Sequence, residues 1–229
     1  VLIRNGLGFV FDRLRGKLPE GAEPENTQEK ENLPASMPER LRITLTELVP
    51  TFVKLGQILA GRPDLMPREY IKELVKLQDQ VSPFPYEEVR KTIKEEFAQE
   101  IEELFDSFEE EPIAAASIAQ GHKATLKDGT EVFVKVRRPG IEQSIRADLE
   151  ILTMLADFVE KNDENLRFLQ PGKVIREFAR SLEEELNLDY EMANIQRFAR
   201  QFKDRKGLYV PKVWPKLCSE KVLTMEFIH

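Results

Sequence analysis

A lysine stands in the middle of an apolar run at Val132–Val136, which reads Val-Phe-Val-Lys-Val. An ammonium group in an apolar strand is costly unless it meets an anion. In protein kinases, a lysine on the third strand binds nucleotide phosphates and pairs with a glutamate from a helix. Lys135 is therefore a candidate phosphate ligand. The motif alone also fits a strand-edge lysine whose stem carries its ammonium to solvent.

A run of small side chains precedes this strand, where a kinase carries the loop that covers the phosphates. The run consists of Ala114, Ala115, Ala116, Ser117, Ile118, Ala119 and Gln120. Small side chains let backbone N–H groups approach phosphates, although alanine tolerates positive φ less well than glycine. The run is a candidate nucleotide-binding loop, and a tightly packed strand crossing is the alternative.

A third group lies within residues 51–59. Lys54 and Gln57 are three residues apart, so they share one face of a helix. Gly56 between them permits close packing against that helix. Taken alone, the group also fits a solvated lysine beside a glutamine.

Together these segments resemble the UbiB family, also called the ADCK-type atypical kinases, from about Leu41 to Ile228. The segments that carry the resemblance are Pro50–Gln57, Arg62–Leu65, Leu77–Asp79, Pro112–Gln120 and Val134–Ile141. The resemblance implies a kinase-like fold linked to ubiquinone and isoprenoid-lipid metabolism. It also implies that Lys54 points toward the nucleotide, that Gln57 holds a helical extension over the site, and that the alanine-rich loop alters nucleotide preference.

The family's acidic motif falls on Glu185-Leu186-Asn187, followed by Glu191 and Asn194. The resemblance makes Glu185 the partner of Lys54 and Glu191 the partner of Lys135. Spacing alone favours Glu150 for Lys135, because ordinary kinases place this glutamate sooner after the lysine; an inserted helix explains the longer gap.

Two departures from the family pattern accompany this motif. Asn187 replaces the expected aspartate and carries no charge, so either the motif is weakened or Asp189 substitutes for it. Gly121 stands where the family usually has valine, and we expect it to loosen the strand slightly without removing the site.

Residues Val222–Ile228 resemble the fifth kinase strand as it enters the hinge. Met225 then takes the gatekeeper position. The Glu226 carbonyl and the Ile228 amide are expected to meet the adenine edge through the backbone.

The elements that position these residues change in character along the chain. Helical periodicity predicts four helices, at Glu39–Leu48, Pro50–Leu59, Pro67–Gln80 and Pro85–Ala98, with a short element at Ile101–Phe108. Strands are expected at Ile113–Gln120, His122–Leu126 and Val132–Val136, with a hairpin turn at Asp128-Gly129. A helix over Ile141–Lys161, a second from Pro171 to Phe202 broken near Asn187, and strands at Leu208–Val213 and Lys221–Phe227 complete the order.

This order predicts an α+β protein: a kinase-like small lobe with a five-stranded antiparallel sheet, preceded by a helical extension, with the large lobe absent. The expected organisation is an amphipathic segment and linker at 1–38, the extension at 39–110, and the small lobe at 111–229. The first 17 residues are apolar and net basic, which suits either an anionic membrane surface or packing on another part of the protein.

Composition narrows the function classes. The 229 residues carry a formal charge of -7, which argues against nucleic acid as a partner. A single cysteine and two histidines exclude an internal disulfide, make a metal-ligand set unexpected and suit a reducing cytosol. We expect a cytoplasmic protein peripherally associated with a membrane.

The sequence thus predicts the ATP- or ADP-binding amino-terminal part of an atypical kinase-like ATPase or phosphotransferase. Its Mg²⁺ ligands are expected in the missing large lobe, since no Asp-Phe-Gly or catalytic-loop motif is present, and this portion alone is expected to be inactive. Isoprenoid or quinone-like lipids and quinone-biosynthesis proteins are the expected partners. A pseudokinase or ATP-sensing scaffold, and a lipid-binding helical module, are the alternatives.

Overall fold

The computed structural model describes residues 36–48, 50–77, 81–162, 167 and 170–229. The amphipathic segment expected at the start of the chain lies outside these residues. The chain divides into two compact units, one within residues 1–79 and 146–178 and the other formed by residues 80–145 and 179–229. The linear boundary expected near residue 110 stays a prediction.

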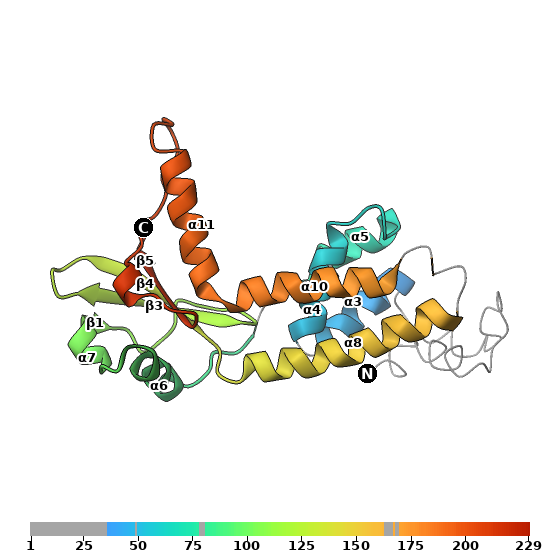
Figure 1. Cartoon of the computed structure of the whole chain (residues 1–229), viewed down its shortest axis with the longest axis horizontal. Helices are drawn as coiled ribbons and strands as arrows, with labels where there is room; N and C mark the ends of the chain where they lie inside the picture. The colour runs from blue at the N-terminus through green and yellow to red at the C-terminus, as the bar shows by residue number, and fades with distance from the viewer. Residues whose placement is uncertain (1–35, 49, 78–80, 163–166, 168–169) are drawn as a thin grey trace. The chain divides into compact units, whose positions relative to one another are not determined.

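The second unit is built on a five-stranded antiparallel sheet (Figure 1). Its strands are β1 (Phe105–Phe108), β2 (Ala114–Ala115), β3 (Ala119–Leu126), β4 (Glu131–Arg137) and β5 (Val222–Glu226). They lie in the order β1-β3-β4-β5, and β2 pairs with β3. The predicted β3–β4 turn is confirmed: Gly129 has φ of 85°, and the Asp128 carboxylate accepts the backbone N–H of Thr130 at 3.0 Å.

Two strand predictions were wrong in detail, and one strand was missed. Ala119 and Gln120 belong to the same strand as His122, because β3 pairs with β4 without interruption through Gly121. The segment Phe105–Phe108 is a strand that pairs with β3, with Phe105 opposite Leu126. Its first residue, Phe105, is buried in the core and is only 2% exposed. Residues 208–213 form no strand; Pro211 cannot donate to a ladder, and only a single bridge joins Val213 to Met225.

One face of the sheet is covered by helix α6 (Tyr86–Phe97), followed by the short helix α7 (Ile101–Leu104). Val132, Val134 and Val136 alternate along β4 and are fully buried against Val89 and Ile93 of α6. Helix α11 (Leu188–Gln201) lies on the opposite side of the sheet from α6 (Figure 1). Lys135 of β4 faces this second side, where it meets Glu191 of α11.

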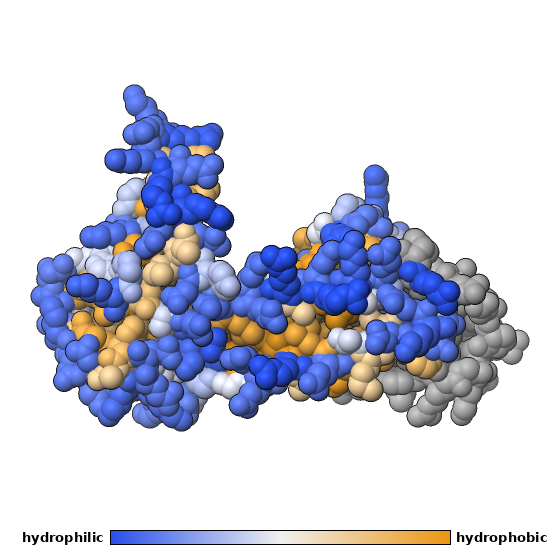
Figure 2. Space-filling view, in the orientation of Figure 1, coloured by the Kyte–Doolittle hydropathy of each residue, from blue (hydrophilic) through white to orange (hydrophobic). Residues whose placement is uncertain are grey.

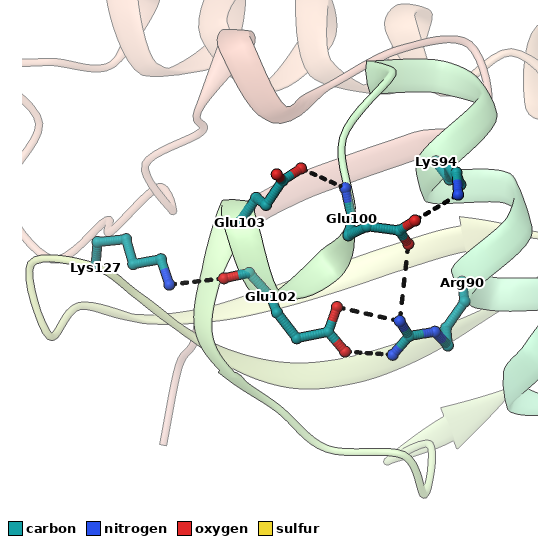
Figure 3. Close-up of polar contacts among 6 residues, drawn as sticks. All are labelled: Arg90, Lys94, Glu100, Glu102, Glu103 and Lys127. Atoms are coloured by element: carbon teal, nitrogen blue, oxygen red, sulfur yellow. Dashed lines mark hydrogen bonds and ion pairs between the residues drawn. The ribbon is translucent and has the colours of Figure 1, made fainter.

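A network of charged groups ties α6 and α7 to the β3–β4 turn (Figure 3). Its members are Arg90, Lys94, Glu100, Glu102, Glu103 and Lys127. The Arg90 guanidinium contacts both carboxylate oxygens of Glu102, and the Lys127 ammonium donates to the Glu102 carbonyl at 2.8 Å. Exposed pairs of this kind stabilise only modestly, so they fix orientation more than they hold the fold.

The first unit is helical. It contains α3 (Met37–Glu47), α4 (Pro50–Ala60), α5 (Arg68–Leu74) and most of α8 (Ile141–Asn162), and α10 (Pro171–Leu186) begins in it. Leu45, Val53, Leu74 and Leu77 form the core among α3, α4 and α5. The expected Pro67–Gln80 helix ends early, at Leu74. Apolar surface is visible in the region of α8 and α10 (Figure 2), where Ile151 and Met154 of α8 are 52% and 72% exposed.

The predicted break in the long carboxy-terminal helix is confirmed at Asn187, which separates α10 from α11. A 3₁₀ turn, η1 (Pro215–Leu217), precedes β5. Within the ranges described, no helix is long and apolar enough to cross a membrane.

Candidate functional site

Lys135 lies on the face of β4 that is turned away from the valine core. Because residues directly opposite in an antiparallel pair point to the same side, Gly121 of β3 and Leu223 of β5 share its face. Phe133, two residues earlier on β4, shares this face as well. The core-facing valines are fully buried, whereas the side chains of Phe133 and Lys135 are partly exposed. This is the face of the strand that a ligand can reach.

The ammonium of Lys135 donates to the Glu191 carboxylate, with 2.7 Å between Nζ and Oε2. The two side chains are 30% and 39% exposed. The predicted Lys135–Glu191 pair is therefore confirmed, and Glu150, which spacing alone favoured, belongs to the other compact unit. The partial exposure of the lysine leaves its side chain open enough to meet a further anion.

Glu191 is held in place by the way α11 begins. The Asn187 side chain accepts the backbone N–H of Asp189 at 2.9 Å and so caps the helix. The backbone N–H of Leu188, which is fully buried, donates to the Glu220 carbonyl at 3.0 Å. The first turn of α11 is thereby fixed against the segment that leads into β5.

Arg137 also stabilises the junction between α10 and α11, and the sequence did not identify it as a site residue. Its guanidinium donates to the Leu186 carbonyl at 2.7 Å, at the end of α10, and the residue is only 9% exposed. A second cation two residues after Lys135 on an apolar strand is the signal that could have found it. Arg137 satisfies a helix-terminal carbonyl and holds α10 and α11 at the strand that carries Lys135.

An open cavity of about 560 Å³ lies where α10 passes into α11. It is lined by Ser181, Glu184, Glu185, Tyr190, Glu191, Asn194, Ile195 and Arg197. The structure thus brings the two glutamates of the predicted site, Glu185 and Glu191, to one cavity wall. Its three carboxylates against a single arginine disfavour an anion, so the candidate phosphate position is at Lys135 and not in this cavity.

The alanine-rich run forms β2, a tight turn and the start of β3. The Ala116 N–H donates to the Ala119 carbonyl at 2.8 Å, and the Arg138 N–H donates to the Ile118 carbonyl at 2.7 Å. Ala114 and Ala116 are exposed and Ala115 is partly buried, whereas Ser117–Gln120 are buried. The accessible part of the run is therefore its first three residues, Ala114 to Ala116. The expected role of the run in binding nucleotide stays a prediction.

Gln120 has a structural position that the sequence did not reveal. Its amide accepts the Phe84 N–H at 2.9 Å, donates to the Phe84 carbonyl at 3.2 Å, and lies 3.0 Å from Nε2 of His122. The other ring nitrogen, Nδ1, lies 2.8 Å from the Glu109 carbonyl, which assigns the proton to Nδ1. Burial lowers the pKa of His122 below its ordinary value, so the ring is neutral.

The segment that resembles the fifth kinase strand and the hinge, Val222–Ile228, consists of β5 and the two residues after it. Met225 pairs with Phe133 and therefore shares the Lys135 face, and its gatekeeper role stays a prediction. The Glu226 carboxylate accepts the Tyr209 hydroxyl and the Lys212 N–H, and the first of these bonds lowers its pKa most. Ile228 is 54% exposed. Contacts of the Glu226 carbonyl and the Ile228 amide with a base stay predictions.

The Lys54 group lies on α4, in the first unit. The Gln57 amide donates to the Leu77 carbonyl at 3.3 Å, which ties α4 to the chain after α5. A Cβ atom at Gly56 would lie 2.3 Å from Leu77 Cδ1 and 2.8 Å from Leu45 Cδ1, so the expected close packing at this glycine is confirmed. Lys54 and Glu185 belong to different compact units, and their pairing stays a prediction.

The sequence profile described as the ABC1 atypical kinase-like domain matches residues 76–229. The chain belongs to this family. Among its relatives, a probable protein kinase UbiB of Pseudomonas paraeruginosa is 45% identical over 190 residues, which cover 83% of this chain and 36% of that protein. A probable protein kinase UbiB of Marinobacter nauticus is 41% identical over 191 residues, covering 83% and 35%. The chain thus spans about a third of the length of these relatives.

A solved structure gives the same result for the fold. The Rv3197–erythromycin complex from Mycobacterium tuberculosis superposes with a TM-score of 0.56 and 29% sequence identity, over 81% of this chain and 46% of that one. The resemblance to the UbiB-type atypical kinases and the kinase-like small lobe are both confirmed. The Lys135–Glu191 ion pair lies within the part of the chain that matches the family profile, and the expected role of Lys135 in binding phosphate stays a prediction.

Proposed function

We propose that this chain forms the nucleotide-binding part of an atypical kinase-like ATPase or phosphotransferase whose ligand is ATP or ADP. One observation supports this most strongly: the Lys135 ammonium lies on the partly exposed face of β4, 2.7 Å from the Glu191 carboxylate. A lysine held in this way by a helical glutamate can bind phosphates while its charge and direction are kept. Membership of the ABC1 family supports the same ligand.

The proposal assigns no Mg²⁺ ligand to the residues of this chain. In the parts of the chain that are described, no three His, Cys, Asp or Glu side chains are grouped to hold a metal ion. When bound, Mg²⁺ would neutralise phosphate charge. This chain's own contribution is to orient the phosphates through Lys135, and we place the Mg²⁺ ligands outside it.

The proposed context is ubiquinone or related isoprenoid-lipid metabolism at the cytoplasmic side of a membrane. The UbiB names of the relatives support the pathway. The exposed apolar side chains of Ile151 and Met154 on α8 support contact with a lipid or a partner protein. Quinone-biosynthesis proteins are the partner class that we propose.

A pseudokinase or ATP-sensing scaffold is the second candidate, and Asn187 favours it. The residue replaces the aspartate expected in the family motif and uses its side chain to cap α11. An amide at this position keeps the helix start but supplies no negative charge. Nucleotide binding without turnover by the complete natural protein would support the scaffold.

The proposal is tested by measuring ATP affinity and hydrolysis in the complete natural protein and in its Lys135→Met variant. Removing the ammonium should weaken ATP binding at least about tenfold, which corresponds to about 1.4 kcal/mol. Lys221→Met is the matched control, because Lys221 also pairs with a helical glutamate, at 2.8 Å from Glu96, and is similarly exposed. Unchanged ATP affinity in Lys135→Met, or an equal loss in Lys221→Met, would contradict the proposal.

A further inference from the structure

Gly121 and Phe133 form a complementary pair on the Lys135 face of the sheet. A Cβ atom built on Gly121 would lie 1.9 Å from Cζ of Phe133 and 2.4 Å from its Cε2. The ring of Phe133 therefore occupies the space that a side chain at position 121 would fill. The glycine does more than loosen β3, because its missing side chain makes room for the ring.

The register shows how the ring reaches this place. Phe133 is paired directly with Lys123, whereas Gly121 is paired with Lys135, so the ring leans diagonally across the hairpin toward Lys135. Diagonal neighbours on adjacent strands lie within reach of an aromatic side chain. The ring is thus laid over the backbone of β3 beside the lysine.

The ring has neighbours on both adjacent strands. Met225 pairs with Phe133 on β5, and the chain leaves the sheet one residue later, at Glu226. On β3, Lys123 lies opposite Phe133 and is ion-paired with Glu131. Lys135 follows Phe133 by two residues on the same face, a rise of about 6.6 Å along the strand, and the ring leans toward it over Gly121.

We propose that Phe133, accommodated by Gly121, is the stacking surface for the base of the bound nucleotide. A nucleotide whose phosphates meet Lys135 carries its planar base at the other end, and the partly exposed ring of Phe133 lies on the same face of the sheet, where that base can stack. Bases stack favourably on aromatic side chains, and an aliphatic wall offers less. The inference rests on the proposed nucleotide function, and it assigns Phe133 to base recognition and Lys135 to the phosphates.

The test compares two ligands that share phosphates and differ in the base: ATP and inorganic tripolyphosphate. In the complete natural protein, Phe133→Leu should weaken ATP binding about tenfold and leave tripolyphosphate binding unchanged, whereas Phe133→Tyr should keep the ATP affinity. Lys135→Met should weaken both ligands. Phe198→Ala, which removes an exposed ring on α11, is the matched control and should change neither.

Each outcome decides one of the two proposals. If ATP binding depends on Lys135 but Phe133→Leu leaves it unchanged, or weakens tripolyphosphate equally, base stacking on Phe133 is overturned while the proposed function stands. If the unaltered protein binds neither ligand, the proposed function fails and the inference fails with it.

A stability measurement tests the Gly121–Phe133 pair without any ligand. Gly121→Val should lower the midpoint of urea unfolding, because the added side chain overlaps the ring. Adding Phe133→Ala to that variant should recover part of the loss, since the space is then free. Equal losses in the single and double variants, or no loss in Gly121→Val, would overturn the complementary packing.

Discussion

The ammonium of Lys135 and the carboxylate of Glu191 are joined across 2.7 Å, from the middle of β4 to the first turn of α11. Both side chains keep about a third of their surface exposed. Ion pairs exposed to this degree contribute about 0–1 kcal/mol, because solvent screens the attraction and ordering two long side chains costs entropy. The pair therefore sets the direction of the lysine and is not needed for the sheet to fold.

This predicts a small coupling energy between the two residues. In a double-mutant cycle with Lys135→Met and Glu191→Gln, measured by urea unfolding without nucleotide, we expect a coupling of at most about 1 kcal/mol. When ATP affinity is measured in the same variants, Glu191→Gln should weaken ATP binding less than Lys135→Met does. A coupling of several kcal/mol in unfolding would mean that the pair is a structural element of the lobe.

Gly56 gives a prediction for the helical unit. Gly56→Ala should destabilise the chain by about 1–2 kcal/mol, although alanine has the higher helix propensity, because the new methyl group overlaps the buried side chains of Leu77 and Leu45. Gly61→Ala is the control: its Cβ would meet only the Ile58 carbonyl oxygen, at 3.4 Å, and the change should stay within about 0.5 kcal/mol. Urea unfolding measures both, and equal effects would contradict the packing argument.

Much of the fold could be predicted from local signals. The helix starts follow prolines, the Asp128-Gly129 turn follows from its residue types, and the break at Asn187 follows from a residue that caps a helix better than it continues one. The β1 strand could not, because Phe105–Phe108 is too short for periodicity to separate it from the helix before it. Residues 208–213 look like a strand by composition, but the preference of Val and Tyr for strands does not supply the N–H that Pro211 lacks.

Some features of the candidate site could also be predicted from the sequence, and others could not. The Lys135–Glu191 pair was predictable, because a buried-strand lysine requires an anion and the family resemblance named it. The contacts of Arg137, Gln120 and the Phe133 ring were not, since each is made with a residue distant in the sequence: Leu186, Phe84 and Gly121 respectively. From the sequence, Gly121 was expected only to loosen the strand slightly; the register and the ring position show that its missing side chain leaves room for Phe133.

His122 predicts a pH dependence of stability. Its folded-state pKa is lowered by burial, so the unfolded chain binds a proton more readily than the folded chain below the ordinary value near 6.5. The free energy of unfolding should therefore fall as pH decreases from about 6.5, by at most about 1.4 kcal/mol per pH unit from this group. His122→Gln should flatten the profile between about pH 5.5 and 7. Urea unfolding at several pH values measures the slope, and a slope in this variant identical to that of the natural chain would contradict the assignment.

Asn187 predicts separate effects of capping and charge at the start of α11. Asn187→Ala removes the acceptor for the Asp189 N–H and should lower the free energy of unfolding by about 1 kcal/mol. Asn187→Asp keeps the acceptor, adds a negative charge at a helix N-terminus and should be at least as stable as the natural chain. Asn194→Ala is the matched control on the same helix; its side chain meets only Arg197 at the exposed surface, and alanine is the better helix former there, so no loss is expected.

The same variants link this cap to the ligand. Glu191 lies in the first turn that Asn187 caps, so fraying of that turn in Asn187→Ala should release the carboxylate from Lys135 and weaken ATP binding, whereas Asn187→Asp should preserve it. If Asn187→Ala lost stability but kept full ATP affinity, the start of α11 would serve the fold alone, and Glu191 would not be the residue that orients Lys135 for phosphate.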